Sequence, residues 1–189
     1  MTTDRWIPKE TDRPVYRTRP LPRGELKGLF LLAEPVFVAT RDALVSFALA
    51  GIANRGHEGI VYWAGREAGD CTVFMQAVVP IADHSHGRVM VSAEEIGRTQ
   101  RAARRDKCGI LCQVHSHPGA DTRHSDGDDE LVLLPFEGML SVVAPQFGVA
   151  LRSIEELSIH QFQDGKWVLC SSDSVSSRLL VVPALRDLR

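Results

Sequence analysis

The sequence predicts a mixed α/β layer fold in which one central β-sheet is flanked by helices. Two observations predict this class. Short apolar runs of strand length recur along the 189 residues, and segments with the apolar spacing of helices lie between them. The length suits a single domain with a substantial core, and 44% hydrophobic with 24% charged residues is ordinary for a globular protein.

Three parts are expected along the chain. Residues 1–34 are rich in Arg, Lys and Pro with little periodicity, so we expect an extended arm that wraps the domain or is partly disordered. Residues 35–170 carry the periodic segments and form the predicted domain. Residues 171–189 form a tail that begins as a polar link over 171–177.

Apolar, strand-forming runs bounded by turn residues predict the sheet. The expected strands are 36–39, 59–64 (closed by Gly65), 72–79, 109–115, 139–144, 157–162, 167–170 and, as a last edge strand, 179–182. Asp164-Gly165 is typical of a hairpin turn between two of them.

Three segments are expected to be helical. Leu44, Phe47 and Ile52 have the spacing of an amphipathic helix over 41–53. Ser92 followed by Glu95 forms a capping box that begins a helix to about residue 105. A third, short helix is expected to open at Ser125 and to run to about residue 133.

Bulk charge and composition exclude some functions. A net charge of −2 gives no general attraction to nucleic acid or to an anionic membrane. We see no signal peptide and no apolar run near the ~20 residues that span a bilayer, so we expect a cytoplasmic protein. The four cysteines are then expected to be reduced thiols.

The most informative motif is H-x-H followed by S-x-x-D. His115 and His117 lie two residues apart on an expected strand, so their side chains share one face, while Cys112 falls on the other as a core thiol. Pro118 ends the strand, and a seven-residue loop leads to Ser125 and Asp128. Two imidazoles and a carboxylate are ligands that catalytic zinc takes, with the fourth position left to water.

Several parts of this pattern also have simpler interpretations. Ser125-x-x-Asp128 alone would be a helix-capping pattern. His84-Ser85-His86 repeats the H-x-H spacing, but no S-x-x-D follows it, so we expect a loop and no second zinc site.

Two further groups carry alternatives. Arg98, Arg101 and Arg105 form a basic stripe at helical spacing, which is a solvated face or a docking surface for an acidic partner. Glu58 precedes the expected strand 59–64 and is the candidate base for metal-assisted hydrolysis, although such a residue alone is usually a surface charge.

Together these residues resemble the signature of the JAB/MPN metalloproteases, the JAMM group. The likeness rests on Glu58 before a Gly-and-apolar strand, His115-Ser116-His117-Pro118, and Ser125-x-x-Asp128, and it covers roughly residues 36–163. It implies the mixed-sheet, cytidine-deaminase-like architecture of that family. It also implies one zinc ion held by His115, His117 and Asp128, with Glu58 as general acid and base and Ser125 as hydrogen-bond donor to the oxyanion.

The resemblance also implies a substrate class. The family hydrolyses the amide bond after the C-terminal glycine of ubiquitin or a ubiquitin-like protein, and a single-domain chain is similar to its stand-alone prokaryotic forms. We therefore expect a zinc isopeptidase or peptidase whose partner is a ubiquitin-like protein or its conjugates. The alternatives are a zinc amidohydrolase acting on a small-molecule or sulfur-carrier adduct and a non-catalytic MPN-type scaffold.

Overall fold

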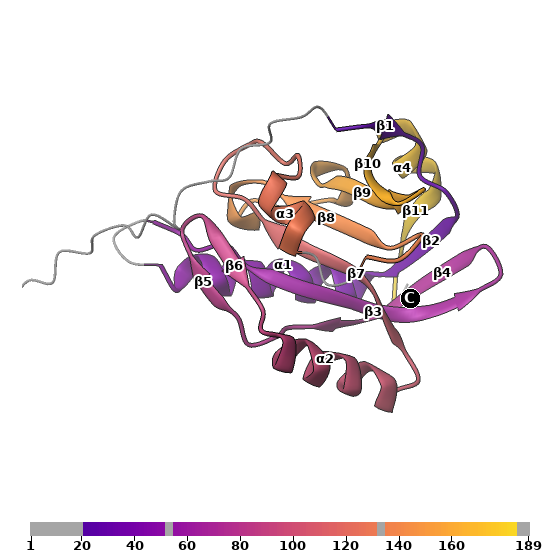
Figure 1. Cartoon of the computed structure of the whole chain (residues 1–189). Coiled ribbons are helices and arrows are strands. Elements are labelled where there is room, and N and C mark those ends of the chain that lie inside the picture. Colours follow the sequence, from indigo (N-terminus) through magenta and orange to yellow (C-terminus); the bar gives the residue numbers. More distant parts are fainter. Residues whose placement is uncertain (1–20, 52–54, 132–134, 185–189) are drawn as a thin grey trace, which may run out of the picture.

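A computed structural model gives the fold and describes residues 21–51, 55–131 and 135–184 (Figure 1). Nine strands form one sheet in the order β1-β10-β9-β8-β7-β3-β4-β2-β11, and β5 pairs with β6 in a separate hairpin. The pair β7–β8 is parallel and β3–β7 is antiparallel, so the sheet is mixed as predicted.

The elements have the following bounds. The strands are β1 (Arg23–Gly24), β2 (Leu29–Ala33), β3 (Ile60–Ala68), β4 (Cys71–Val78), β5 (Asp83–Ser85), β6 (Arg88–Met90), β7 (Gly109–Ser116), β8 (Leu140–Ala144), β9 (Ser158–Gln163), β10 (Lys166–Cys170) and β11 (Leu179–Val182). The helices are α1 (Glu34–Leu49), α2 (Ala93–Arg105), α3 (Asp126–Leu131) and α4 (Ser172–Arg178), with 3₁₀ turns at Gln146–Gly148 and Ile154–Glu156.

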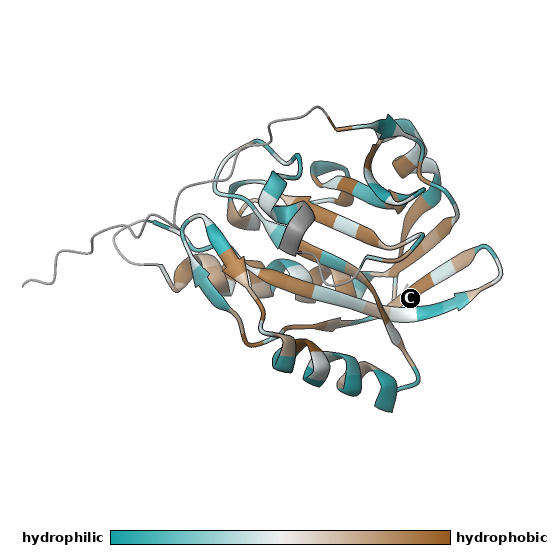
Figure 2. Ribbon diagram, viewed as in Figure 1, coloured by the Kyte–Doolittle hydropathy of each residue, from teal (hydrophilic) through white to brown (hydrophobic). Residues whose placement is uncertain are grey.

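Two helices cover opposite faces of the sheet. Trp63 of β3 belongs to the main core together with residues of α1, whereas the next residue, Ala64, packs against Ala103 of α2. Because successive strand residues point to opposite faces, α1 and α2 lie on opposite sides. Figure 1 shows α1 behind the sheet and α2 along its lower side, and Figure 2 shows the apolar strands between them.

The beginning of the chain differs from the prediction. The expected strand 36–39 is wrong, because these residues lie in α1, which begins at Glu34 and ends at Leu49. Pro35 in the first turn suits a helix start, and Glu34 complements the positive end of the helix dipole. The helix therefore begins seven residues before the expected 41–53.

The two flanking segments contribute to the sheet. β1 and β2 fall within the expected arm 1–34, and Leu32 of β2 is fully buried. The polar link expected over 171–177 is wrong, because Ser171 caps α4 by accepting a hydrogen bond from the Ser174 N–H. The edge strand expected at 179–182 is confirmed as β11, which pairs with β2. Residues 1–20 of the expected arm lie outside the described residues.

Gly65 does not end its strand as predicted, because β3 continues to Ala68. The glycine sits at a register shift against β4, where an added Cβ would lie 2.0 Å from the Val73 carbonyl oxygen. The close approach of the β4 backbone leaves no room for a side chain, which explains why residue 65 is a glycine. By contrast, the helix start at Ser92 and the Asp164-Gly165 turn are confirmed, and both turn residues have positive φ.

Candidate metal centre

β7 places the first histidine of the motif in the centre of the sheet. His115 is 3% exposed, and it faces Ile60 of β3 on one side and Val143 of β8 on the other. Cys112 lies in the main core, as predicted, and burial raises the pKa of its thiol well above the usual value. The strand alternation therefore separates a packed face from a polar face at the end of β7.

Asp128 reaches the histidines from α3. Ser125 precedes this helix, its backbone N–H donates to Asp128 Oδ2 at 2.7 Å, and its hydroxyl accepts from the Asp128 N–H at 3.1 Å. The capping geometry of S-x-x-D thus forms, and it holds the carboxylate at the same time. The capping interpretation is confirmed, and the same geometry leaves Asp128 in a group of residues that could hold a metal ion.

The three side chains meet in a small triangle. His115 Nε2 lies 3.2 Å from His117 Nε2 and 3.3 Å from Asp128 Oδ1, and His117 Nε2 lies 3.2 Å from Asp128 Oδ2. Two ligands bound 2.0–2.1 Å from a tetrahedral zinc ion lie about 3.3–3.4 Å apart. The donor types and spacings therefore fit three vertices of a zinc tetrahedron, and this set is a possible metal site among the described residues.

Hydrogen bonding prepares His117 as a ligand. Its Nδ1 lies 2.8 Å from the Asp121 carbonyl oxygen, which can only accept, so Nδ1 carries the proton and Nε2 is free to bind. Burial acts to lower the pKa of His117, but Asp128, the Asp121 carbonyl and Glu58 together outweigh burial, and the pKa is raised.

The two neighbouring histidines favour the ionised form of Asp128. Burial alone would raise the pKa of Asp128, but the two histidines hold it well below its ordinary value. The carboxylate is therefore ionised at neutral pH, which is the form that binds a metal ion.

Glu58 lies beside this triangle at the start of β3. It is 8% exposed, its N–H donates to the Ser85 carbonyl oxygen at 2.8 Å, and the N–H of Gly59 donates to Ser116 Oγ at 2.9 Å. The serine between the two histidines thus ties the strand of Glu58 to the strand of the ligands.

Burial raises the pKa of Glu58 to about 8, with a smaller lowering effect from His117 and a raising effect from Asp128. A carboxyl group with a pKa near neutrality is suited to general acid–base catalysis. The structure brings all five predicted site residues to the adjoining ends of β3 and β7 and to the first turn of α3.

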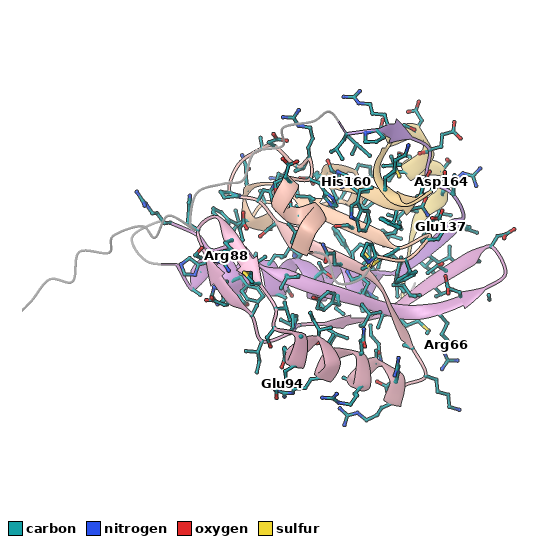
Figure 3. All side chains as sticks on the ribbon, in the orientation of Figure 1. Arg66, Arg88, Glu94, Glu137, His160 and Asp164 are labelled. Atoms are coloured by element: carbon teal, nitrogen blue, oxygen red, sulfur yellow. The ribbon has the colours of Figure 1, made fainter. Side chains whose placement is uncertain are left out.

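A buried histidine that carried no clear role in the sequence lies behind the ligands. His124 is fully buried, its Nε2 lies 2.8 Å from Ser141 Oγ, and its ring stacks on His160 at 3.9 Å between centroids. Its ring centroid is 5.9 Å from that of His115. Figure 3 shows His160 in the interior of the upper half of the fold. In the sequence, the only indication that His124 lies near the site was its position directly before Ser125.

His84 and His86 do not join the ligand set. The expected loop is instead the β5–β6 hairpin, and His84 Nδ1 lies 2.9 Å from His57 Nδ1. His86 donates to the Gly56 carbonyl oxygen at 3.0 Å. The hairpin thus packs beside the segment that leads to Glu58.

Comparison with known proteins agrees with this geometry. Residues 40–154 match the family of prokaryotic homologues of the JAB domain. The chain belongs to this family. Within this match lie Glu58, both histidine ligands, Ser125 and Asp128.

One curated relative of this JAB-family chain is "Probable metalloprotease y4jG" of Sinorhizobium fredii (strain NBRC 101917 / NGR234). The two are 36% identical over 103 residues, which is 52% of this chain and 63% of the relative. The match thus spans less than two thirds of that relative.

A solved structure shares the fold. The solution structure of protein DSY2949 from Desulfitobacterium hafniense superposes with a TM-score of 0.61 at 14% identity, covering 83% of this chain and 95% of the other. Within the described residues, no helix has the length and apolar character to cross a membrane.

Proposed function

We propose that this chain is a zinc-dependent isopeptidase or peptidase that hydrolyses the amide bond after the C-terminal glycine of a ubiquitin-like protein. The observation that carries the proposal is the His115–His117–Asp128 triangle with zinc-like spacings, next to a buried carboxyl group. Membership of the JAB family and a relative named as a probable metalloprotease support it.

Each residue has a distinct task in the proposed reaction. His115, His117 and Asp128 hold the metal ion, which when bound supplies Lewis-acid polarisation of the scissile carbonyl and lowers the pKa of water. Glu58 takes the proton from the attacking water and later delivers it to the departing amine.

In the proposed reaction, Ser125 donates a hydrogen bond to the developing oxyanion. Its hydroxyl oxygen already accepts the Asp128 N–H, so its own O–H proton remains for donation. A donor aimed at the oxyanion stabilises the transition state more than the ground state. This role explains why a serine serves better here than an aspartate, which would cap the helix but could not donate.

The experiment is a substrate trap with a matched control. The variant Glu58→Gln should retain zinc and bound substrate while losing the catalytic base, so it is isolated from native cells together with whatever it binds. The control is Glu67→Gln, which changes an exposed residue at the far end of β3 and is isolated in the same way. We expect a small ubiquitin-like protein or its conjugates on the first variant only. Added wild-type enzyme should then release a product that ends in the C-terminal glycine, as measured by mass spectrometry.

Other outcomes would overturn the proposal. If both variants retain the same proteins, and the wild type hydrolyses a small amide as fast as a folded protein conjugate, the substrate is a small-molecule adduct. If Glu58→Gln and wild type do not differ in any hydrolysis while zinc is bound, the metal is structural and the chain is a scaffold.

A further inference from the structure

The outer face of α2 carries a dense group of arginines. Arg98, Arg101, Arg104 and Arg105 are exposed, whereas Ala103 packs against the sheet. Arg98 pairs with Glu95 at 3.1 Å, but no carboxylate of the described residues lies within ion-pair distance of the other three arginines. Figure 2 shows the hydrophilic character of this helix.

These arginines line a groove beside the sheet. The groove has a volume of about 930 Å³ and lies between α2 and the end of β4, where Val78 and Val79 form an apolar wall. In Figure 3, Glu94 marks the beginning of α2 and Arg66, which donates to the Lys107 carbonyl oxygen, marks its end. The groove therefore combines a cationic side with an apolar side.

The wall of the groove is also a strand edge. β4 pairs with β3 as far as Val78, but its pairing with β2 ends at Phe74. Within the described residues, Gln76–Val78 is thus paired on one side only, and Met75 lies at a register shift where β4 bulges against β3. Met75 and Val79 are 41% and 51% exposed. An unpaired edge with exposed apolar side chains is a template for an added strand.

We propose that this groove binds an extended, acidic polypeptide segment of another protein. Its backbone pairs with the free edge of β4 at Gln76–Val78, and its carboxylates bind the arginines of α2. Main-chain pairing of this kind gives affinity, and alternate side chains give specificity. Guanidinium–carboxylate pairs supply the charge-assisted hydrogen bonds.

The charge and the lining residues of the groove favour an acidic peptide over other ligands. Residues 1–20 of this chain carry five basic and three acidic residues, so the chain's own N-terminal segment has the wrong charge. A single-stranded nucleic acid would match the arginines, but its bases need aromatic side chains for stacking, and none lines the groove. The valine wall and the strand edge suit a peptide.

The groove lies on the same face of the sheet as the metal centre. Val78 pairs with Tyr62 of β3, and Tyr62 pairs with Gln113, two residues before His115 on β7. A protein anchored at α2 would therefore lie on the same face of the sheet as the metal-binding triangle. The inference stands on the groove itself and does not depend on the proposed hydrolysis.

The test uses a peptide of alternating glutamate and valine, acetyl-Glu-Val-Glu-Val-Glu-Val-Glu-amide, titrated into the ¹⁵N-labelled full chain at low ionic strength. We expect chemical-shift changes at the amides of Met75–Val79 and of α2. The same peptide with glutamine or lysine in place of glutamate should bind more weakly. In the double variant Arg98→Glu/Arg101→Glu, the affinity should fall at least about tenfold, because two charge-assisted contacts become repulsive.

The control variant is Arg178→Glu, which changes an exposed arginine of α4 outside the groove and should leave the affinity unchanged. Unchanged zinc content and amide dispersion show that each variant is folded. Equal binding of the lysine peptide, shifts confined to other surfaces, or no shifts at millimolar peptide would overturn the proposal. Tighter binding of a seven-residue oligothymidylate at the same amides would assign the groove to nucleic acid instead, and self-association in the absence of peptide would assign it to a second copy.

Discussion

Replacing Glu58 by glutamine should stabilise the metal-free protein while it abolishes hydrolysis. The pKa of Glu58 is raised from 4.5 to about 8 by burial, so the folded state keeps this carboxyl protonated where the unfolded chain ionises it. The contribution of this protonated carboxyl to the free energy of unfolding is fully present below pH 4.5 and is lost as the pH rises through 8. At 1.36 kcal/mol per pKa unit, the loss amounts to about 4 kcal/mol at pH 8. Glutamine does not ionise and avoids this loss.

The assay is urea unfolding in the presence of a chelator at pH 5, 6.5 and 8. The free energy of unfolding of Glu58→Gln minus that of wild type should grow across this range by roughly 1 kcal/mol per pH unit. The control is Glu67→Gln, an exposed residue of the same strand, for which the difference should stay flat. A flat difference for Glu58→Gln would refute the inference that burial keeps this carboxyl protonated.

Three further variants probe the remaining side chains of the site. Asp128→Ala should remove zinc and activity together, measured by metal analysis and hydrolysis; a variant that keeps one zinc per chain would contradict the ligand assignment. Ser125→Ala should retain zinc but lose about 10²–10³-fold in kcat, and an unchanged kcat would exclude its role at the oxyanion. His124→Phe keeps the stack on His160 but loses the contact with Ser141. Its zinc affinity should fall in a chelator competition, because the His124 ring lies against that of His115 at 5.9 Å between centroids, and equal affinity would show that His124 serves packing alone.

The clustering of His115, His117 and Asp128 was predictable because its geometry is local. His115 and His117 share a face through strand alternation, and the Ser125–Asp128 cap spans a single helical turn. Short-range rules of strand and helix are sufficient for both. Placing Glu58 from the sequence required the family resemblance, since its approach to the ligands depends on β3 pairing with a strand about fifty residues away.

The errors at secondary-structure level have two causes. The strand expected at 36–39 and the link expected at 171–177 were assigned from composition, but both segments begin with helix-start chemistry, at Pro35 and Ser171. Leu29–Ala33 was missed because it is a short apolar run inside a basic, proline-rich region, and only pairing between β4 and β11 makes it a strand. Local helix-start signals thus explain the first two cases, and tertiary pairing explains the third.

Glu58 and the metal ion are coupled through charge. A base must be ionised to accept a proton, yet burial gives Glu58 a pKa of about 8, so without a metal most of these carboxyls are protonated at neutral pH. A divalent cation held by His115, His117 and Asp128 would favour the ionised form, since an opposite charge nearby lowers a carboxyl pKa. The burial that lowers the stability of the metal-free protein thus also confines the ionised, proton-accepting form of Glu58 mainly to the metal-loaded state. A solvent-exposed glutamate would be ionised in both states and could not make that distinction.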